Sequence, residues 1–188
     1  MVDERIESGT KARTRRAILD AAVAVLSKDT SASLADIATA AGVGRTTVHR
    51  YFPERSHLLT AINTDAWERI AEATQRARLH DGDAVAALDR LCQAYFDLGD
   101  VLMLIFNEPS FAAGIDWNEE TKDDIALRQV VERGHRDGTI DPDMPPRWIV
   151  HALWTLLYAA WQHAQLDDVP RHDALTTCLR SLRKLLAP

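Results

Sequence analysis

Apolar residues recur at spacings of three and four along most of the 188-residue chain, which is the period of an amphipathic helix. No stretch alternates apolar and polar residues in the way of a half-buried strand. Only 8 glycines and 7 prolines interrupt the pattern, so we expect an all-α fold of about nine helices. The expected helices cover residues 11–28, 33–41, 45–52, 54 or 56 to 79, 84–98, 101–106, 119–136, 146–165 and 172–186, after a loose arm at 1–9.

Two short helices separated by a glycine turn are predicted between residues 33 and 52. Ser33 and Asp36 are placed to cap the start of the first, because short polar side chains satisfy free backbone N–H groups there. Gly42 follows its last turn and can adopt the left-handed conformation that ends a helix. Pro53 ends the second helix by disfavouring helical geometry at Phe52. Helix, short turn and helix together form a helix-turn-helix motif.

Polar side chains fill most of the second short helix, and they are of the kinds that bind DNA. Arg45 can reach a guanine edge in bidentate fashion, and Thr46 or Thr47 can contact a thymine methyl group or a phosphate. Phe52 and Val48 are expected in the core. The motif therefore predicts a helix that lies in the major groove with its first residues at base edges.

The spacing of apolar, turn and terminal residues in this segment is specific. The residues concerned are Ile37, Ala38, Ala41, Gly42 and Val43, followed by Thr47, Val48, Tyr51, Phe52, Pro53, Arg55 and Leu58. This arrangement resembles the DNA-binding segment of TetR-type transcriptional repressors. The sequence departs from that family at His49 and Arg55, where members usually carry Tyr and Lys, and in a shorter connection at 28–32 that lacks the usual glycine.

The resemblance implies a set of DNA-contacting residues, in which His49, Tyr51 and Arg55 take the family's phosphate-contacting positions. The full set is Arg13, Ser33, Arg45, Thr46, Thr47, His49, Arg50, Tyr51 and Arg55. The basic residues at 11–16 are either a solvated helix face or phosphate contacts. Beside a helix-turn-helix we favour phosphate contacts for one or two of them.

Charge is distributed unevenly, although the net charge of −6 is at first sight wrong for a DNA-binding protein. Residues 1–60 hold nine basic and seven acidic residues, a balance of +2. Residues 61–188 hold 13 basic and 21 acidic residues, a balance of −8. The positive part thus coincides with the motif, and the acidic remainder should discourage non-specific adhesion to DNA.

The predicted helix at 56–79 contains no Gly or Pro, so it should join a DNA-binding domain at 1–55 to residues 56–188 as a rod. The resemblance implies that residues 56–188 form a helical effector-binding and dimerisation domain with a mostly apolar cavity. Its expected lining is Trp67, Tyr95, Met103, Phe106, Phe111, Trp117, Trp154 and Tyr158, with Asp97, Glu108 or His135 as polar anchors. Taken singly, each aromatic residue fits ordinary core packing better. Five Trp residues nevertheless favour an aromatic or hydrophobic effector.

The last two predicted helices carry more apolar surface than one core needs. The helix at 146–165 is apolar over more than half its circumference, and the last helix has a seam of three-four spacing. The resemblance implies that both pair with their copies in a four-helix bundle, so a homodimer is favoured over a monomer. The residues expected at this interface are Trp148, Ala152, Leu156, Trp161, Leu175, Leu179, Leu182 and Leu186.

An enzyme is the first alternative to a DNA-binding regulator. We find no G-x-S-x-G, HExxH, phosphate-binding loop or dinucleotide fingerprint, and therefore expect no catalytic residues. The seven His residues share no ligand spacing, so no metal or cofactor is expected. Cys92 and Cys178 lie far apart without a CxxC motif, which favours core packing.

A helical ligand-binding or protein-interaction protein that does not bind DNA is the second alternative, and the basic groups on the expected DNA face argue against it. The N-terminus is charged throughout, unlike a signal peptide, and the most apolar window, 148–161, is too short to cross a bilayer. We therefore expect a cytoplasmic protein without membrane contact. The predicted function is a repressor that binds a palindromic double-stranded operator as a homodimer and is released by a small, largely hydrophobic effector.

Overall fold

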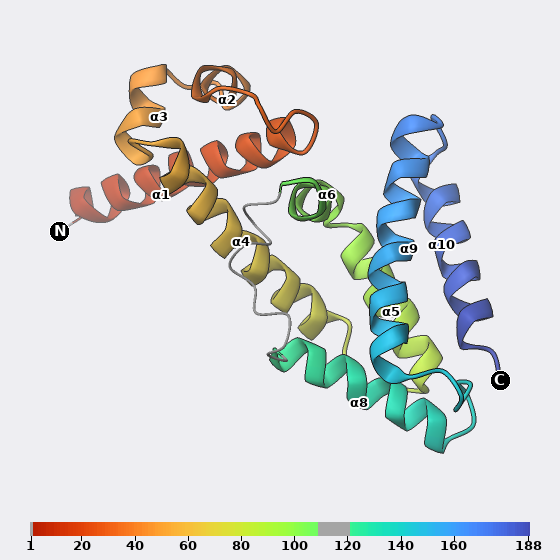
Figure 1. The fold of residues 1–188 in the computed structure, drawn as a ribbon. Helices are drawn as coiled ribbons and strands as arrows, with labels where there is room; N and C mark the ends of the chain where they lie inside the picture. Colours follow the sequence, from red (N-terminus) through yellow and green to blue (C-terminus); the bar gives the residue numbers. More distant parts are fainter. Residues whose placement is uncertain (1, 109–120) are drawn as a thin grey trace. The chain divides into compact units, whose positions relative to one another are not determined.

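The computed structural model describes the backbone of residues 2–108 and 121–188 and the side chains of 9–108 and 121–188. This part of the chain is all-helical, with no strand (Figure 1). Its helices are α1 (Val2–Leu26), α2 (Leu34–Ala40), α3 (Arg45–Tyr51), α4 (Arg55–Arg76), α5 (Ala84–Phe96), α6 (Gly99–Asn107), α8 (Lys122–Arg136), α9 (Pro146–Leu166) and α10 (Arg171–Leu186). The predicted fold class is confirmed.

The N-terminal arm is helical, which corrects the expectation of a loose segment at 1–9. α1 begins at Val2 and runs without interruption to Leu26. Three acidic residues in the first seven positions favour a helix start there, because negative charge suits the positive end of a helix.

The start of α8 also differs from the expectation. Thr121 Oγ1 accepts the Asp124 backbone N–H at 3.1 Å, and the Asp124 carboxylate accepts the Thr121 N–H at 3.0 Å. This reciprocal capping box fixes the helix start at Lys122. Residues 119 and 120, with which the expected helix begins, lie outside the described residues.

The chain packs into two compact units, and the division falls inside α4, after Trp67. The first unit takes its described residues from Met1–Trp67 and Met103–Gly114. α1 packs on α2 and α2 on α3, so the three helices lie together (Figure 1). Their buried side chains include Ile18, Leu19, Ala22, Val23, Leu26, Ile37, Ala38, Val48 and Phe52.

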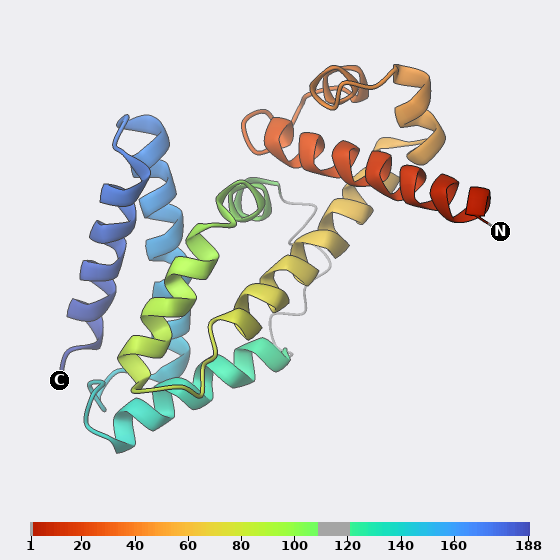
Figure 2. The same ribbon diagram turned by 180° about the vertical axis from the view of Figure 1, so that it is seen from behind.

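The second unit takes its described residues from Glu68–Leu102 and Ile115–Pro188. α9 and α10 lie side by side, α5 packs on both, and α8 packs on α5 and α9 (Figures 1 and 2). Trp161 of α9 anchors this packing, since its indole N–H donates to the Phe96 carbonyl oxygen at 3.0 Å. Gly99 allows that placement, because a Cβ there would come within 1.5 Å of Trp161 Cζ2.

Three residues expected at a dimer interface lie in the core of the subunit instead. Trp161 is 6% exposed, and Leu182 and Leu186 are 0% exposed. The buried stripe of α10 consists of Ala174, Cys178, Leu182 and Leu186. Leu175 and Leu179 are half-buried on the neighbouring face. The three-four seam therefore spans two adjacent faces of the helix, and spacing alone could not say which one belongs to the subunit's own core.

Candidate functional site

The first helix of the motif, α2, begins with the expected cap. The Ser33 backbone N–H donates to Asp36 Oδ2 at 2.8 Å, and the Asp36 N–H donates to Ser33 Oγ at 3.3 Å. The Ser33 hydroxyl also donates to Asp36 Oδ2 at 2.6 Å, and these bonds hold the pKa of the Asp36 carboxyl below its usual range. Ser33 is exposed, and its side chain forms this cap.

The turn after α2 depends on Gly42, whose φ of +65° lies in the left-handed region. With Gly42 in this conformation, the Val43 N–H donates to the Ala38 carbonyl oxygen at 3.0 Å and closes the helix end. Gly44 follows in an extended conformation as the N-cap of α3. The turn therefore directs the chain from α2 into α3 within three residues.

α3 presents one polar face and buries the other. Arg45, Thr46, His49 and Arg50 are exposed, and their spacing of one, four and five places them on the same side of the helix. Val48 is 0% exposed and holds the opposite side in the core. Two turns of helix thus carry four hydrogen-bonding side chains outward from a fixed apolar base.

The remaining predicted residues of α3 lie at the edges of this face. Thr47 and Tyr51 are half-buried. The Arg50 guanidinium lies over the Tyr51 ring, 5.6 Å from its centroid, and His49 Nδ1 lies 3.4 Å from the Pro53 carbonyl oxygen. These contacts hold the exposed side chains close to the helix surface.

The basic residues of α1 are engaged in different ways. Arg13 is exposed and donates to Thr10 Oγ1 at 3.1 Å, and the Arg15 guanidinium lies 5.6 Å from the centroid of the Phe52 ring. Arg16 is bound to the carboxylates of Asp20 and Asp65. Arg16 is therefore less available for a phosphate contact than Arg13 or Arg15.

The Arg55 side chain, which the resemblance assigns to a phosphate-contacting position, binds backbone atoms of its own chain. Its guanidinium donates to the carbonyl oxygens of Ala32, at 2.5 Å, and Thr30. No local signal could have shown this, because both acceptors are backbone atoms more than 20 residues away. The Arg16–Asp20 pair, in contrast, has the four-residue spacing of a helical ion pair.

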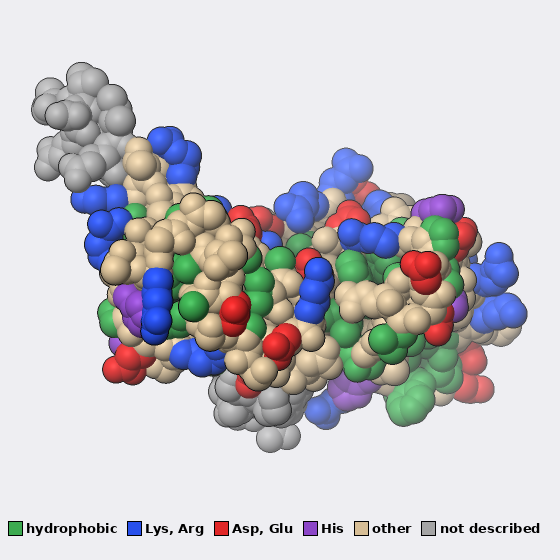
Figure 3. Space-filling model, turned by 90° about the horizontal axis from the view of Figure 1, so that it is seen from above, with side chains coloured by type: hydrophobic (Ala, Val, Ile, Leu, Met, Phe, Trp, Pro, Cys, Tyr) green, Lys and Arg blue, Asp and Glu red, His purple; other side chains and the backbone are tan. Residues whose placement is uncertain are grey.

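Lys and Arg side chains are interspersed with acids on the molecular face drawn in Figure 3 rather than gathered in one field. On this face, therefore, no broad positive field would attract DNA. This favours specific contacts from the exposed face of α3.

Two of the predicted cavity residues are brought together in the second unit. The rings of Tyr95 and Trp154 stack with their centroids 4.8 Å apart. The Tyr95 hydroxyl lies 2.7 Å from Thr74 Oγ1, which itself donates to the Ile70 carbonyl oxygen at 2.9 Å. Burial raises the pKa of the Tyr95 hydroxyl, so this group stays protonated.

Two acidic residues of α8 also affect the pKa of Tyr95. The negative charges of Asp123 and Asp124 add to the rise in the Tyr95 pKa. Burial, with the neighbouring charge of Asp124, raises the pKa of the Asp123 carboxyl. Sequence reasoning named neither Thr74 nor Asp123, because no periodicity links α4 and α8 to α5.

The other predicted cavity residues are dispersed over the chain. Trp67 and Phe106 are exposed and Met103 is buried, all in the first unit. Tyr158 is half-buried and accepts a hydrogen bond from Gln162 at 2.7 Å. Phe111 and Trp117 lie outside the described residues. In residues 2–108 and 121–188, no cluster of His, Cys, Asp and Glu is suited to a metal ion, and no helix is long and apolar enough to cross a bilayer.

A capped helix, a glycine turn and a second helix with an outward polar face define a helix-turn-helix regulatory protein. The sequence profile of the bacterial regulatory proteins of the tetR family matches residues 18–62. The chain is also 42% identical over 184 residues to the HTH-type transcriptional repressor LfrR of Mycolicibacterium smegmatis, covering 96% of each chain. The protein therefore belongs to the TetR family.

Solved structures agree with this assignment. The TetR-like regulator LfrR from Mycobacterium smegmatis in complex with proflavine superposes with a TM-score of 0.72 at 37% identity, over 94% of this chain and 98% of that one. LfrR described without a ligand gives a TM-score of 0.68 at 35% identity, over 92% and 99% of the two chains. The Bacillus subtilis regulator FadR with stearoyl-CoA, at 17% identity and a TM-score of 0.65 over 92% and 99%, shares the fold.

Proposed function

We propose that this protein is a ligand-responsive transcriptional repressor that binds a palindromic operator as a homodimer. In this proposal residues 1–55 bind DNA, and residues 56–188 bind the effector and the second subunit. The observation that carries it is the exposed face of α3, where Arg45, Thr46, His49 and Arg50 project from a helix whose other side is buried. The 42% identical relative, itself described as a repressor, supports it.

On DNA, α3 would lie in the major groove with Arg45 and Thr46 at base edges, because the first residues of a recognition helix face the bases. His49 and Arg50 sit one turn later on the same face, where they would contact phosphates. Arg13 of α1 is exposed and supplies a further phosphate contact. Thr47, Tyr51 and Ser33 would add contacts at the edges of this face.

The dimer would form through the outer faces of α9 and α10. Trp148 is 59% exposed, and Ala152, Leu156, Leu175 and Leu179 are half-buried in the subunit. An exposed tryptophan beside several partly exposed leucines is typical of an interface rather than of a solvated surface. Two-fold symmetry would then match the two halves of a palindrome.

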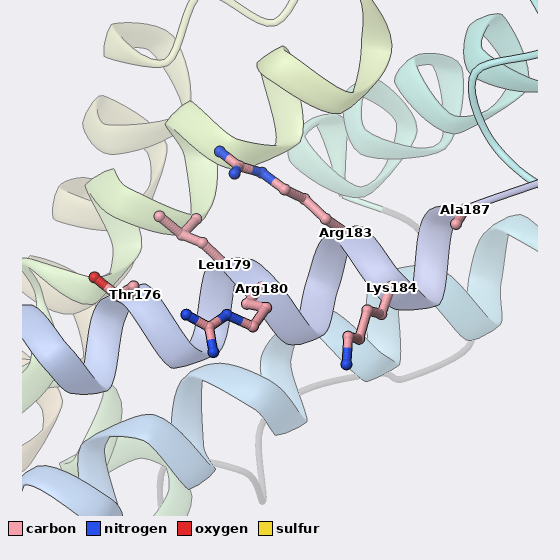
Figure 4. Close-up of a pocket in the computed structure, with 6 residues that line it drawn as sticks. All are labelled: Thr176, Leu179, Arg180, Arg183, Lys184 and Ala187. Atoms are coloured by element: carbon pink, nitrogen blue, oxygen red, sulfur yellow. The ribbon is translucent and has the colours of Figure 1, made fainter.

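Two open hollows on these helices fit the same interpretation. One, of about 390 Å³, is lined by Trp148, His151, Ala152, Thr155, Leu156, Ser181 and Leu185. The other, of about 420 Å³, is lined by Thr176, Leu179, Arg180, Arg183, Lys184 and Ala187 (Figure 4). In that view Arg183 extends toward α5, where it pairs with Asp89, while Arg180 and Lys184 extend away from it. Side chains of a second subunit can fill such hollows.

The effector would be a small, planar aromatic cation, which narrows the largely hydrophobic ligand expected from the sequence. The similar regulator LfrR is described with proflavine, a planar aromatic cation. Trp154 is half-buried and stacks on the buried ring of Tyr95, and the negative charge of Asp123, a half-buried residue, acts on Tyr95. Stacking and ion pairing are the two interactions that such a cation requires.

Gel retardation at a fixed salt concentration tests DNA binding, with the region upstream of the protein's own gene and a random duplex of equal length as probes. We expect retardation of the upstream region at protein concentrations that leave the random duplex free. A wild-type protein that retards neither probe would contradict the proposal and favour a helical ligand-binding protein without DNA binding.

A further inference from the structure

Arg55 makes a contact that DNA binding by α3 does not explain. It is the first residue of α4 and is half-buried. Its two terminal nitrogens donate to two different backbone carbonyls, of Ala32 and Thr30, in the connection between α1 and α2. A guanidinium used in this way has its flat edge turned to the protein, so it is poorly placed to bind a phosphate as well.

The two acceptors lie immediately before the cap of α2. Ala32 directly precedes Ser33, the N-cap residue. The chain from Thr30 to Arg55 contains all of α2, the turn and α3, and the Arg55 hydrogen bonds join its two ends. The Arg55 side chain therefore links the two ends of the helix-turn-helix segment by hydrogen bonds.

The connection that receives Arg55 is itself well ordered by hydrogen bonds. The Ser31 N–H and hydroxyl donate to Asp29 Oδ1 at 2.9 and 2.6 Å, and the Ala32 N–H donates to the Asp29 carbonyl oxygen at 3.1 Å. The chain here is folded back so that the carbonyls of Thr30 and Ala32 both face one point. A planar fork with parallel N–H groups fits two such acceptors, whereas a lysine ammonium is a single point charge.

A second contact ties α4 to the same unit. The Arg16 guanidinium of α1 binds the Asp65 carboxylate of α4 at 2.5 and 3.2 Å, and the Asp65 side chain is 13% exposed. Residues 55 and 65 are about 15 Å apart along a helix. α4 is thus held to α1 at one point and to the start of α2 at another.

We propose that Arg55 is a positioning residue for operator recognition and not a phosphate ligand. By joining the start of α4 to the start of α2, it fixes the angle at which α3 is presented to the major groove. The proposal rests on the proposed function, because it assigns a role in that same DNA-binding site.

The variants Arg55→Lys and Arg55→Ala separate positioning from phosphate binding. Both should weaken operator binding by about tenfold or more while random-DNA binding changes little, because a tilted α3 loses base contacts and keeps backbone contacts. The slope of log Kd against log salt should stay at the wild-type value in both. Arg50→Ala is the matched control, and its slope should fall by about 0.9 for one lost phosphate contact.

Three results would overturn the proposal: full operator affinity in Arg55→Lys, a salt slope reduced by about 0.9 in Arg55→Ala, or equal losses on operator and random DNA. Affinities are normalised to the folded fraction of each variant. A loss of stability alone therefore leaves the ratio of operator affinity to random-DNA affinity unchanged.

Amide hydrogen exchange tests the link between Arg55 and the start of α2 without DNA. This measurement therefore remains decisive if the wild type binds no operator and the proposed function fails. Arg55→Lys should speed exchange over residues 33–52 and leave α9 and α10 at wild-type rates. Unchanged exchange over 33–52 would overturn the proposal, whereas absence of wild-type DNA binding alone would overturn only the proposed function.

Discussion

At the scale of single residues, the proposed DNA binding depends on which side chains α3 turns outward. Arg45 and Thr46 begin the exposed face, and His49 and Arg50 continue it one turn later. Val48 and Phe52 are buried beneath them and fix the rotation of the helix about its axis. A change at an outward residue should therefore alter binding without altering the fold.

Replacing Arg45 by alanine should weaken operator binding by about 1–3 kcal/mol and relax sequence choice at one base pair, because a bidentate guanine contact is lost. Fluorescence anisotropy with operators that carry single base substitutions measures both effects. Arg50→Ala, on the same face, should reduce affinity for operator and random DNA alike. The base-reading role of Arg45 would have to be abandoned if its variant showed that same uniform loss.

The capping box of α2 should make the stability of the motif depend on pH. Hydrogen bonds from Ser33 hold the pKa of the Asp36 carboxyl below its ordinary value of about 4. The ionised carboxylate therefore stabilises the folded state above the ordinary pKa, and this contribution is lost as the pH falls through the lowered folded-state pKa.

Thermal unfolding followed by circular dichroism between about pH 2 and pH 6 tests the contribution of this carboxylate. Wild type should lose stability more steeply on acidification than Asp36→Asn, which carries a neutral side chain at every pH. Parallel curves for the two proteins would show that the Asp36 carboxylate contributes nothing that depends on pH.

At the scale of helices, the sequence predicts where a helix is capped. It does not predict which of two apolar faces is buried in the subunit. Ser33, the expected cap of α2, accepts the Asp36 backbone N–H three residues further on. Caps can be predicted because they depend on residues three positions apart. The outer face of α10 could not be predicted, since Leu179 and Leu182 have the same chemistry and only packing against α5 and α9 distinguishes them.

That distinction leads to a pair of contrasting variants in α10. Leu179→Glu should convert a dimer to a monomer with the fold retained, because a charge is placed on the outer face. Leu182→Ala should instead cost about 2–5 kcal/mol of folding free energy, because it leaves a cavity in the subunit core. Light scattering with size exclusion and chemical unfolding measure the two effects. A dimeric Leu179→Glu protein would contradict the proposed interface.

The seam between α5 and α10 contains both cysteines of the chain. Cys92 Sγ and Cys178 Sγ lie 3.5 Å apart, and both residues are buried. The hydrogen bond to Cys178, together with burial, raises the pKa of the Cys92 thiol. Sequence reasoning placed both residues in the core but could not pair them across 86 positions.

Neither thiol should react with a disulfide reagent at neutral pH while the protein is folded, because burial excludes the reagent from both sulfur atoms. Both should react after denaturation. Absorbance of the released thiolate counts the accessible groups over time. Rapid reaction of one thiol in the native protein would show that the α5–α10 seam opens readily.

At the scale of the whole molecule, the charge balance is positive in residues 1–60 and negative in residues 61–188. The fold class and the DNA-binding motif could be predicted, because both depend on periodicity and on a compact run of residues. The contacts of α4 could not, since Arg16 and Asp65 are 49 positions apart and Arg55 binds backbone atoms that carry no sequence signal. Long-range polar contacts have no periodicity.

We propose that an aromatic cation bound by the second unit releases the protein from its operator. Proflavine added to the wild-type complex, followed by anisotropy of a labelled operator, tests it directly. Because a planar cation also binds DNA itself, Asp123→Asn protein on the same operator is the control. We expect release of the wild-type protein at proflavine concentrations that leave the variant bound. Equal release of both proteins, or of neither, would contradict it.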